Sequence, residues 1–472
     1  MTGYGYARTL AVFATDAWRD GVGDVRLSDQ VGRVLDVVGN SIAAIHEDTV
    51  GIVTASTLAQ AGSGSASAIG SGVQISPAHA ALVNGTLAHA LDFDDTHLPS
   101  ILHPSAVIVP AALAVAEHQK STGSELLTAV AIGNEVTCRI GMGAYNPEIR
   151  NSVFFEKGLH ATSICGTIGA AVATALLLGA DTDSVADSIG IAASMGSGLI
   201  EANRTGGTVK RLHCGWAAHS GVTAGLLAAA GMTGPPTVLE GRFGFFRAYT
   251  DGFLDEPAML GQLGERWEID RLFYKPYPAN HFTHAAIDAA IAVRNMGVAP
   301  ATITEIRLGA PAPVLRTIAE PIEKKASPET PYFAKFSGPY AVAAALSGGS
   351  GLGVGSTDFT DDAIHDSERL RLAGLVECYP DVHAGEIFPN QFPAVLTVTL
   401  DDGTQIENRV DVNRGGPENP LTTAELRQKF TINAVPVVGD ELAHTVAASV
   451  ENLSSAGSAD ALSAALGKVV VN

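Results

Sequence analysis

Cysteine is scarce: the 472-residue chain contains only four, and no two of them form a CxxC pair. A structural zinc site or a dense disulfide framework needs closely spaced or paired cysteines, so neither is indicated. We expect isolated thiols buried in the protein core. The four residues are Cys138, Cys165, Cys214 and Cys378.

Charged side chains are also few, at 17% of the chain, and basic ones are the minority. With 29 Lys and Arg against 49 Asp and Glu, the net charge is −20. Such a body repels polyanions, which argues against nucleic acid and anionic membrane surfaces as partners. Apolar residues make up 46%, which argues against large-scale disorder. A small anionic substrate would need a local basic pocket in this acidic protein.

Long, strongly hydrophobic runs are lacking as well. Residues 161–179 carry no charge, but most are Ala, Gly, Ser and Thr, which pack closely and are weakly hydrophobic. No basic flank or aromatic belt accompanies the segment, so we interpret it as a buried helix rather than a membrane span. The N-terminus has Asp16 early and no convincing cleavage site, so no signal peptide is predicted. The cytoplasm is therefore the expected location.

Helical patterning dominates the early part of the chain. Residues 29–45 place apolar side chains at helical spacing, and residues 105–120 and 124–141 read as two further helices. Residues 62–72 are rich in Gly and Ser, which predicts a mobile loop. This loop leads directly into the most polar stretch of the helical region.

Strand-like alternation is confined to the middle of the chain. It is seen at residues 301–311 and 394–412, and the second of these contains an Asp402-Gly403 turn between two strands. After residue 415 the pattern returns to amphipathic helix, so the tail could rejoin the first domain. The predicted fold is mainly α with a smaller α+β domain, with boundaries at 1–271 (helical, first segment), 272–415 (α+β) and 416–472 (helical, second segment).

The sequence ALDFDDTHLPSILHPS joins an Ala-rich helix to a cluster of acids and histidines. Ser76 is a good N-cap before a proline, so a helix is predicted from there towards Asp92. On it, Asp92 and Thr96 are four apart and would share one side. Pro99 would then break the helix and return His103 to the same turn. Two further acids remain open to either a solvated surface or a functional role: Asp94 and Asp95.

Basic groups gather at two later positions. Lys210, Arg211 and His213 fall in the first turns of a helix, where acids are normally preferred, so a bound anion would compensate them. A solvated basic face is the alternative. Lys275 lies in a proline-interrupted segment, and His160 opens the uncharged helix, where the dipole favours a neutral imidazole. His160 could act as acid, base or hydrogen-bond donor, or could simply cap the helix.

A metal site is not predicted. His281 and His284 are three apart, and Asp288 follows four later, which could be written as a ligand cluster. However, no third histidine lies at a typical ligand spacing. A histidine on the buried face of a helix is also more often a core residue than a metal ligand. No other cofactor is expected.

Several segments resemble the MmgE/PrpD superfamily, which includes 2-methylcitrate dehydratase, cis-aconitate decarboxylase and iminodisuccinate epimerase. In chain order they are NGTLAHALDFDDTH with HPS, KGLHATSICGTIGAA, VKRLHCGWAAHSGV, GPPTVLEGRFGF, YKPYPANHFTHAAIDA and KFSGPYAVAAAL. The resemblance implies an all-helical domain built from both chain ends, an inserted lid domain, and a homodimer. One segment, HLPSIL before His103, differs from decarboxylase-like members. The family's site positions fall on Asp92, Thr96, His103, His160, Lys210 and Lys275.

The expected function is a cofactor-independent lyase acting on a small di- or tricarboxylic acid. Lysines suit carboxylate binding and imidazoles suit proton transfer, so Lys210 and Lys275 would hold the substrate while His103 and His160 act as acid and base. Two imidazoles favour a dehydratase of the 2-methylcitrate type. Decarboxylation, epimerisation and a non-catalytic carboxylate-binding protein remain alternatives. Asp92 would orient an imidazole, and the predicted substrate-binding residues are Thr96, Arg211, His213 and Tyr277.

Overall fold

The computed structural model describes residues 5–470, and the chain folds into two compact units. The first unit extends to Leu272 and resumes at Leu426, and the second spans Phe273–Glu425. Most of the described residues that form regular elements are helical, which confirms a mainly α protein.

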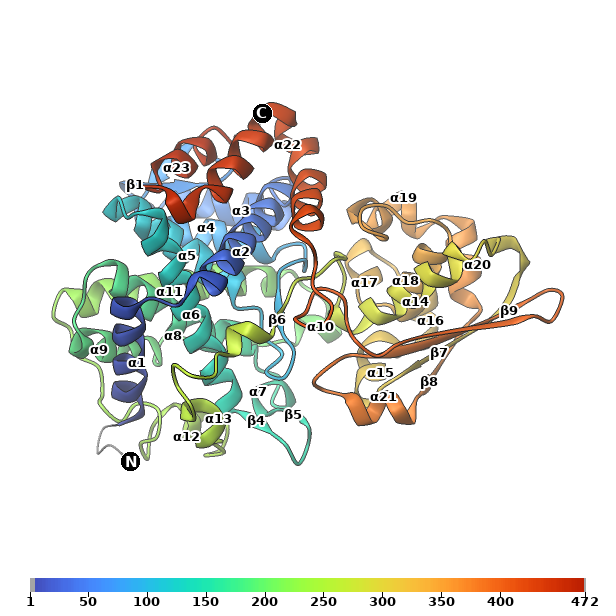
Figure 1. Cartoon of the computed structure of the whole chain (residues 1–472), viewed down its shortest axis with the longest axis horizontal. Coiled ribbons are helices and arrows are strands. Elements are labelled where there is room, and N and C mark those ends of the chain that lie inside the picture. The colour runs from blue at the N-terminus through green and yellow to red at the C-terminus, as the bar shows by residue number, and fades with distance from the viewer. Residues whose placement is uncertain (1–4, 471–472) are drawn as a thin grey trace. The chain divides into compact units, whose positions relative to one another are not determined.

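The first unit is built from helices with a few short strands (Figure 1). Its helices are α1 (Tyr6–Asp20), α2 (Asp24–Ala43), α3 (Asp48–Leu58), α4 (Pro77–His89), α5 (Ser105–Gln119), α6 (Gly123–Gly143), α7 (Val153–Glu156), α8 (Ala161–Leu177), α9 (Thr182–Ala192), α10 (Ala202–Thr205), α11 (Val209–Ala229), α12 (Phe245–Tyr249), α13 (Glu256–Leu260), most of α22 (Thr423–Glu451) and α23 (Asp460–Leu466). Its strands are β1 (Ser63–Ala68), β2 (Val73–Ile75), β3 (Thr96–His97), β4 (Tyr145–Asn146) and β5 (Asn151–Ser152), and β6 (Leu272–Phe273) lies at the boundary.

Small residues allow the central helices to approach closely. Helix α8 is buried at every position from Ala161 to Leu177 and packs against α5, α6 and α11. Where α4 meets α11, a Cβ added to Gly85 would lie 2.8 Å from the Cα of Gly215, closer than such contacts occur. The Ala and Gly content thus serves helix packing, and the buried-helix interpretation of this segment is confirmed. Within residues 5–470, no helix has the length and apolar character needed to cross a membrane.

The segment predicted as a mobile loop at residues 62–72 is instead a β-hairpin. Strands β1 and β2 pair antiparallel, and Ala66 and Ala68 are buried. Asn84 of α4 fixes the hairpin: its Nδ2 donates to Ser67 O at 2.9 Å, and its Oδ1 accepts from Ile69 N–H at 2.9 Å. The loop prediction was wrong because these contacts come from a separate helix and are not encoded by local composition.

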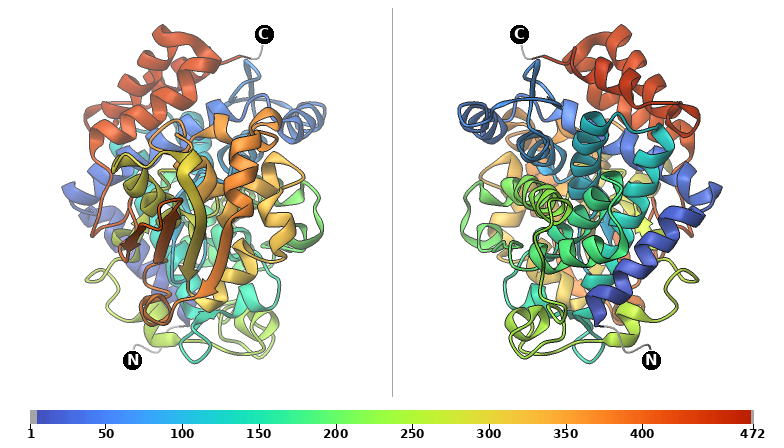
Figure 2. Two further views of the ribbon diagram at one scale, coloured as in Figure 1. Left: turned by 90° about the vertical axis from the view of Figure 1, so that its right-hand side faces the viewer. Right: turned by 90° about the vertical axis from the view of Figure 1, so that its left-hand side faces the viewer.

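The second unit combines a four-stranded sheet with helices. The strands follow the order β10-β9-β7-β8, with β7 and β8 parallel and the other pairs antiparallel, and the left view of Figure 2 shows them side by side. Helix α14 packs on β9 and β10, and α18 packs on α14. The strands are β7 (Ile303–Ala310), β8 (Val376–Pro380), β9 (Ala394–Leu400) and β10 (Gln405–Val410). The helices are α14 (His284–Asn295), α15 (Ala312–Ile318), α16 (Ile322–Ala326), α17 (Pro331–Ala334), α18 (Gly338–Leu346), α19 (Asp361–Ile364), α20 (Ser367–Gly374) and α21 (Val382–Ile387).

The second unit ends at Glu425 rather than at the predicted residue 415. Arg414 pairs with Glu425 at 2.5 Å, and Gly415 N–H donates to Asn419 O at 2.8 Å, so these residues stay together. Three of the cysteines are buried as expected, whereas Cys378 in β8 is only partly buried. All four are free thiols.

Candidate functional site

The polar stretch after α4 forms an irregular buried loop. Ser76 and Pro77 begin α4 as predicted, but the helix ends at His89 and does not reach Asp92. Asp92 has a positive φ of 55°, which a continuing α-helix cannot contain. Thr96 lies beyond, in strand β3. The prediction that Asp92 and Thr96 share a helical turn was therefore wrong, because tertiary burial of the loop overrides the local helical pattern.

Four imidazoles gather where this loop meets α8 and α11. The ring centroids of His89 and His103 lie 5.3 Å apart, those of His89 and His160 lie 5.6 Å apart, and those of His160 and His213 lie 5.0 Å apart. Each histidine comes from a different place: the end of α4, the loop before α5, the N-cap of α8 and the second turn of α11. Residues separated widely in sequence thus form one continuous imidazole cluster.

His103 is held in a defined orientation. Its Nδ1 lies 2.7 Å from the carbonyl oxygen of Asp95, and because a carbonyl only accepts, Nδ1 carries the proton. The backbone N–H of His103 donates to Thr162 Oγ1 at 3.1 Å, and Thr96 Oγ1 lies 3.4 Å from Nδ1. The other ring nitrogen, Nε2, is therefore the one that can exchange a proton with a ligand.

His160 and His213 form a direct imidazole pair. Their Nδ1 atoms lie 2.9 Å apart, so one donates and the other accepts. A shared hydrogen bond of this kind requires that at least one of the two rings is neutral. When both rings are neutral, the ring whose Nδ1 donates can accept a proton at Nε2, and the ring whose Nδ1 accepts carries an Nε2–H that can donate.

Lys210 faces the same loop from the first turn of α11. Its Nζ lies 3.8 Å from Asp92 Oδ2, and the two side chains are 8% and 4% exposed. Arg211, the next residue, projects from another side of the helix. It pairs with Glu47 at 3.4 Å and donates to Thr49 Oγ1 at 3.2 Å. The structure thus brings Lys210 and His213 to the imidazole cluster and binds Arg211 to the start of α3.

Family models match nearly the whole chain. The MmgE/PrpD N-terminal domain matches residues 8–257, and the MmgE/PrpD C-terminal domain matches residues 277–455. The chain belongs to the MmgE/PrpD family.

The chain is similar to several curated proteins named cis-aconitate decarboxylase. The human protein is 30% identical over 399 residues, covering 81% of this chain and 77% of the relative. The mouse protein is 29% identical over 392 residues, covering 80% and 76%. The Aspergillus terreus protein is 32% identical over 237 residues, covering 48% and 47%.

Burial sets the protonation of the histidine pair in this MmgE/PrpD protein. Desolvation, followed by the charges of His89 and Lys210, holds the pKa of His160 well below its usual range. The same causes lower the pKa of His213 to about 4. Both rings are therefore neutral near pH 7, as expected for His160. Burial is the first cause of the lowered pKa of His160, whereas that expectation was based on the helix dipole.

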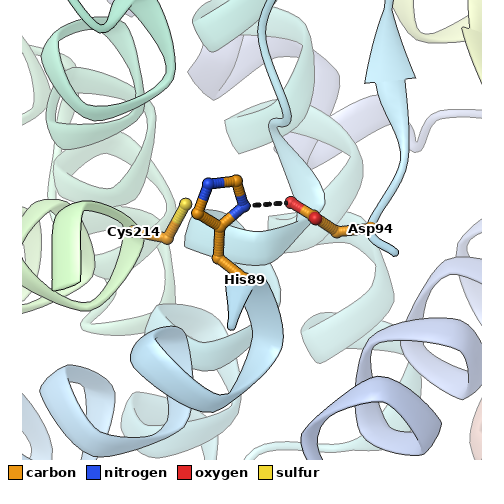
Figure 3. Close-up of side chains that lie close together, drawn as sticks. All are labelled: His89, Asp94 and Cys214. Atoms are coloured by element: carbon orange, nitrogen blue, oxygen red, sulfur yellow. Dashed lines mark hydrogen bonds and ion pairs between the residues drawn. The ribbon is translucent and has the colours of Figure 1, made fainter. Parts of the chain in front are cut away.

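His89 and Asp94 form a buried pair that the sequence did not predict. His89 Nδ1 lies 2.8 Å from Asp94 Oδ2, and Figure 3 shows Cys214 on the other side of the ring. The ligand atoms of these three residues all lie within 4.8 Å of one another. Two ligands of one tetrahedral zinc at 2.0–2.1 Å would stand about 3.3 Å apart, so the 2.8 Å contact is a hydrogen bond rather than metal-binding geometry. A sequence signal existed, since His89 stands five residues before Asp94, but it required the correct helix end.

Asp95 belongs to the same loop and connects it to the start of α5. It accepts from Ser105 Oγ at 2.6 Å and from Ser105 N–H at 3.2 Å, and Arg33 approaches to 3.4 Å. Burial raises the pKa of Asp95 to about 6, against the opposing effects of Arg33 and Ser105. The open question for Asp94 and Asp95 is thus answered in part: both are buried, and neither is a solvated surface acid.

The second unit contains Lys275 and Tyr277. Tyr277 donates to Asp288 at 2.5 Å and accepts from Arg414 at 3.2 Å, and burial raises the pKa of Asp288 to about 6. The tyrosine hydroxyl therefore belongs to a buried network within this unit. Lys275, two residues earlier in the chain, is 1% exposed.

The histidines considered as metal ligands also lie in the second unit. The rings of His281 and His284 are 4.5 Å apart. His284 Nε2 donates to Ala279 O at 3.1 Å, which fixes the orientation of the ring within the unit. The two rings meet at a tilt of 35°, and both side chains are buried.

Proposed function

We propose that this protein is a cofactor-independent lyase that removes carbon dioxide from a small tricarboxylic acid of the cis-aconitate type. The observation that carries the proposal is its similarity to proteins named cis-aconitate decarboxylase, which extends over 81% of the chain in the human case. The sequence alone favoured a hydro-lyase, because two imidazoles suit dehydration. The relatives favour the decarboxylase alternative instead.

The residues of the imidazole cluster suit this chemistry. When the bond to the leaving carboxylate breaks, its electron pair remains on the substrate, and negative charge develops on the carbon framework and its remaining carboxylates. A lysine ammonium in a buried setting stabilises such charge far more than it would in water. Lys210 is the proposed group in the first unit, and the role of Lys275 as a carboxylate clamp remains a prediction from the sequence.

A proton must then be delivered to the carbanion. His103 is the proposed donor, because its Nδ1–H is fixed on the Asp95 carbonyl and its Nε2 can carry the mobile proton. His160 and His213 are neutral, so they are proposed to bind and orient the substrate through hydrogen bonds rather than through charge. Asp92 holds Lys210, and Thr96 is proposed to contact substrate beside His103.

A hydro-lyase stays the second candidate, since one specific observation favours it. His103 and His160 lie in one cluster but in different environments, as an acid and a base for water elimination should. An epimerase would use the same two groups on opposite faces of the substrate. A homodimer and a cytoplasmic location remain predictions.

The test is to incubate the purified protein separately with cis-aconitate, 2-methylcitrate and citrate. Evolved carbon dioxide, alkene absorbance and deuterium uptake from solvent are followed together. The proposal expects stoichiometric carbon dioxide from cis-aconitate. Net dehydration of 2-methylcitrate without carbon dioxide would restore the hydro-lyase. Deuterium exchange with no net reaction would favour an epimerase, and binding without turnover would favour the carboxylate-binding alternative.

A further inference from the structure

Asp94 is a buried carboxylate that faces two imidazoles at once. Its Oδ2 lies 2.8 Å from His89 Nδ1 and 3.9 Å from His103 Nδ1, and its side chain has no exposed surface. Burying an ionised carboxylate costs several kcal/mol unless nearby groups compensate it. The compensation here comes from histidines of the cluster, so the charge of Asp94 is linked to their protonation.

The contact with Asp94 also orients the ring of His89. An ionised carboxylate can only accept, so Nδ1 of His89 carries a proton. Among residues 5–470, Nε2 of the same ring is buried without a hydrogen-bond partner. Figure 3 shows that it points away from Asp94. The ring of His89 therefore lies between the carboxylate of Asp94 and the ring of His160.

The charges around the cluster are distributed unevenly. Asp94 lies on the side of His103, and the backbone carbonyl of Asp95 also faces that ring. On the other side, protonation of His160 is disfavoured by the charges of four residues: Lys210, His89, His103 and His213. Titratable groups near His103 include Asp94, His89 and His160. Asp94 supplies the negative charge that faces its ring.

We propose that Asp94 is a positioning residue whose single negative charge makes His103, and not His160, the proton donor of the site. The proposal deepens the function proposed above and rests on it for the catalytic step. In that step the Nε2–H bond of His103 breaks and a C–H bond forms on the carbanion. His103 is left neutral, with Nδ1–H still on the Asp95 carbonyl, and takes its next proton from solvent. Asp94 touches neither the proton nor the substrate.

The experiment follows histidine protonation without substrate. Histidine-labelled protein is titrated by ¹⁵N NMR as wild type and as Asp94→Asn, which keeps the size and the acceptor oxygen but removes the charge. We expect the midpoint of the His103 titration to fall by about one to three pH units, the range for losing an opposite charge at this distance. Glu268→Gln is the matched control, because Glu268 pairs with His97 at 3.2 Å in the same unit and is equally buried. That control should leave the His103 midpoint unchanged.

A second variant covers the case in which Asp94→Asn does not fold. His89→Gln keeps the Asp94 charge and removes the imidazole that shares it, so the His103 midpoint should stay or rise. A fall in His89→Gln, or an unchanged midpoint in Asp94→Asn, overturns the proposal.

Kinetics on cis-aconitate then separate this proposal from the proposed function. In Asp94→Asn, kcat at pH 7 should fall by about tenfold or more with KM nearly unchanged, since binding groups are untouched. Asp94→Glu should retain part of the activity that Asp94→Asn loses. If the wild type releases no carbon dioxide while the His103 midpoint still shifts, the function is wrong and the role of Asp94 stands. Equal losses in Asp94→Asn and Glu268→Gln would mean a merely structural role.

Discussion

Two buried lysine–aspartate pairs of the first unit contact the same loop, and they differ in the distance between the lysine nitrogen and the carboxylate oxygen. Lys429 of α22 lies 2.5 Å from Asp36 of α2, donates to the carbonyl of Phe93 at 2.9 Å and stands 3.7 Å above the Phe93 ring. Lys210 lies 3.8 Å from Asp92, the residue before Phe93. We call Lys429–Asp36 the closed pair, because its two charged atoms lie within hydrogen-bond distance. Lys210–Asp92 is the open pair, because its two charged atoms lie farther apart than a hydrogen bond.

The difference contrasts a cation bound by protein groups with one that is proposed to bind substrate. Lys429 finds a carboxylate, a carbonyl and an aromatic face, and Asn40 donates to the same Phe93 carbonyl at 3.1 Å. These contacts fix the backbone between Asp92 and Asp94. Lys210 is held beside the imidazoles at a distance that a substrate carboxylate could shorten. Burying a charged side chain costs folding free energy, so each of these lysines requires compensating contacts or a role in binding.

The largest expected effect comes from breaking the closed pair. Lys429→Met leaves Asp36 buried without its cation, and loss of one partner of a buried pair costs about 3–5 kcal/mol. Denaturant unfolding of the variant should show this loss of unfolding free energy. The double variant Asp36→Leu, Lys429→Met should recover most of it, because no uncompensated charge remains. A single variant as stable as wild type would contradict the structural role.

Removing the lysine of the open pair should lower catalytic activity and leave the stability of the fold intact. Lys210→Ala should lower kcat/KM on the identified substrate by about tenfold to a thousandfold, or roughly 1.4 to 4 kcal/mol, while the protein stays folded. Lys275→Ala is expected to do the same. Lys324→Ala is the matched control, because that side chain is 68% exposed and pairs only loosely with Glu329. Wild-type kinetics in both site variants would show that the basic groups were assigned wrongly.

The comparison also shows what the sequence could and could not predict. Helix α8 and the start of α4 follow local rules, namely an uncharged small-residue run and a Ser-Pro N-terminus, and both were predicted. Lys210 and His213 were predicted in the first turns of one helix, which is where α11 holds them. Lys429, by contrast, meets Phe93 across more than three hundred residues of sequence. Nothing local marks such a contact.

The end of α4 failed for a related reason. Its Ala-rich pattern continues past His89, and only burial of the acidic loop, with Asp92 at positive φ, stops it. Once the helix end is misplaced, the pairing of His89 with Asp94 is hidden. For this reason the sequence did not decide whether Asp94 and Asp95 lie on the solvated surface or serve the site. The residue types of the site were thus predicted, but their mutual geometry was not.

A smaller effect concerns stability in acid. The pKa of His213 is lowered to about 4 by burial, by His89 and by Lys210, against an ordinary value of 6.5. The unfolded chain therefore binds the extra proton first, so stability is fully present above pH 6.5 and is lost as pH falls towards 4. His213→Gln should flatten this part of the profile in denaturant unfolding measured at about pH 4.5, 5.5 and 7. Lys210→Met should weaken the dependence slightly, and a profile as steep in His213→Gln as in wild type would contradict the assignment.

The smallest expected effect is that of metal removal, which should be none. Both lysine–aspartate pairs show that the charges around this loop are balanced by protein cations. Among residues 5–470, the three side chains that could hold an ion are His89, Asp94 and Cys214. Two of them are already hydrogen-bonded at 2.8 Å, and burial raises the pKa of Cys214 well above its ordinary value, so the thiol keeps its proton. Activity on the identified substrate should therefore survive exhaustive dialysis against EDTA, with metal content measured in parallel.

Activity that is lost in EDTA and restored by one metal ion would contradict the cofactor-independent mechanism. In that case Cys214→Ser and His284→Gln would tell whether the ion binds in the first unit or beside Asp288 in the second, because only the variant at the true site should prevent the restoration.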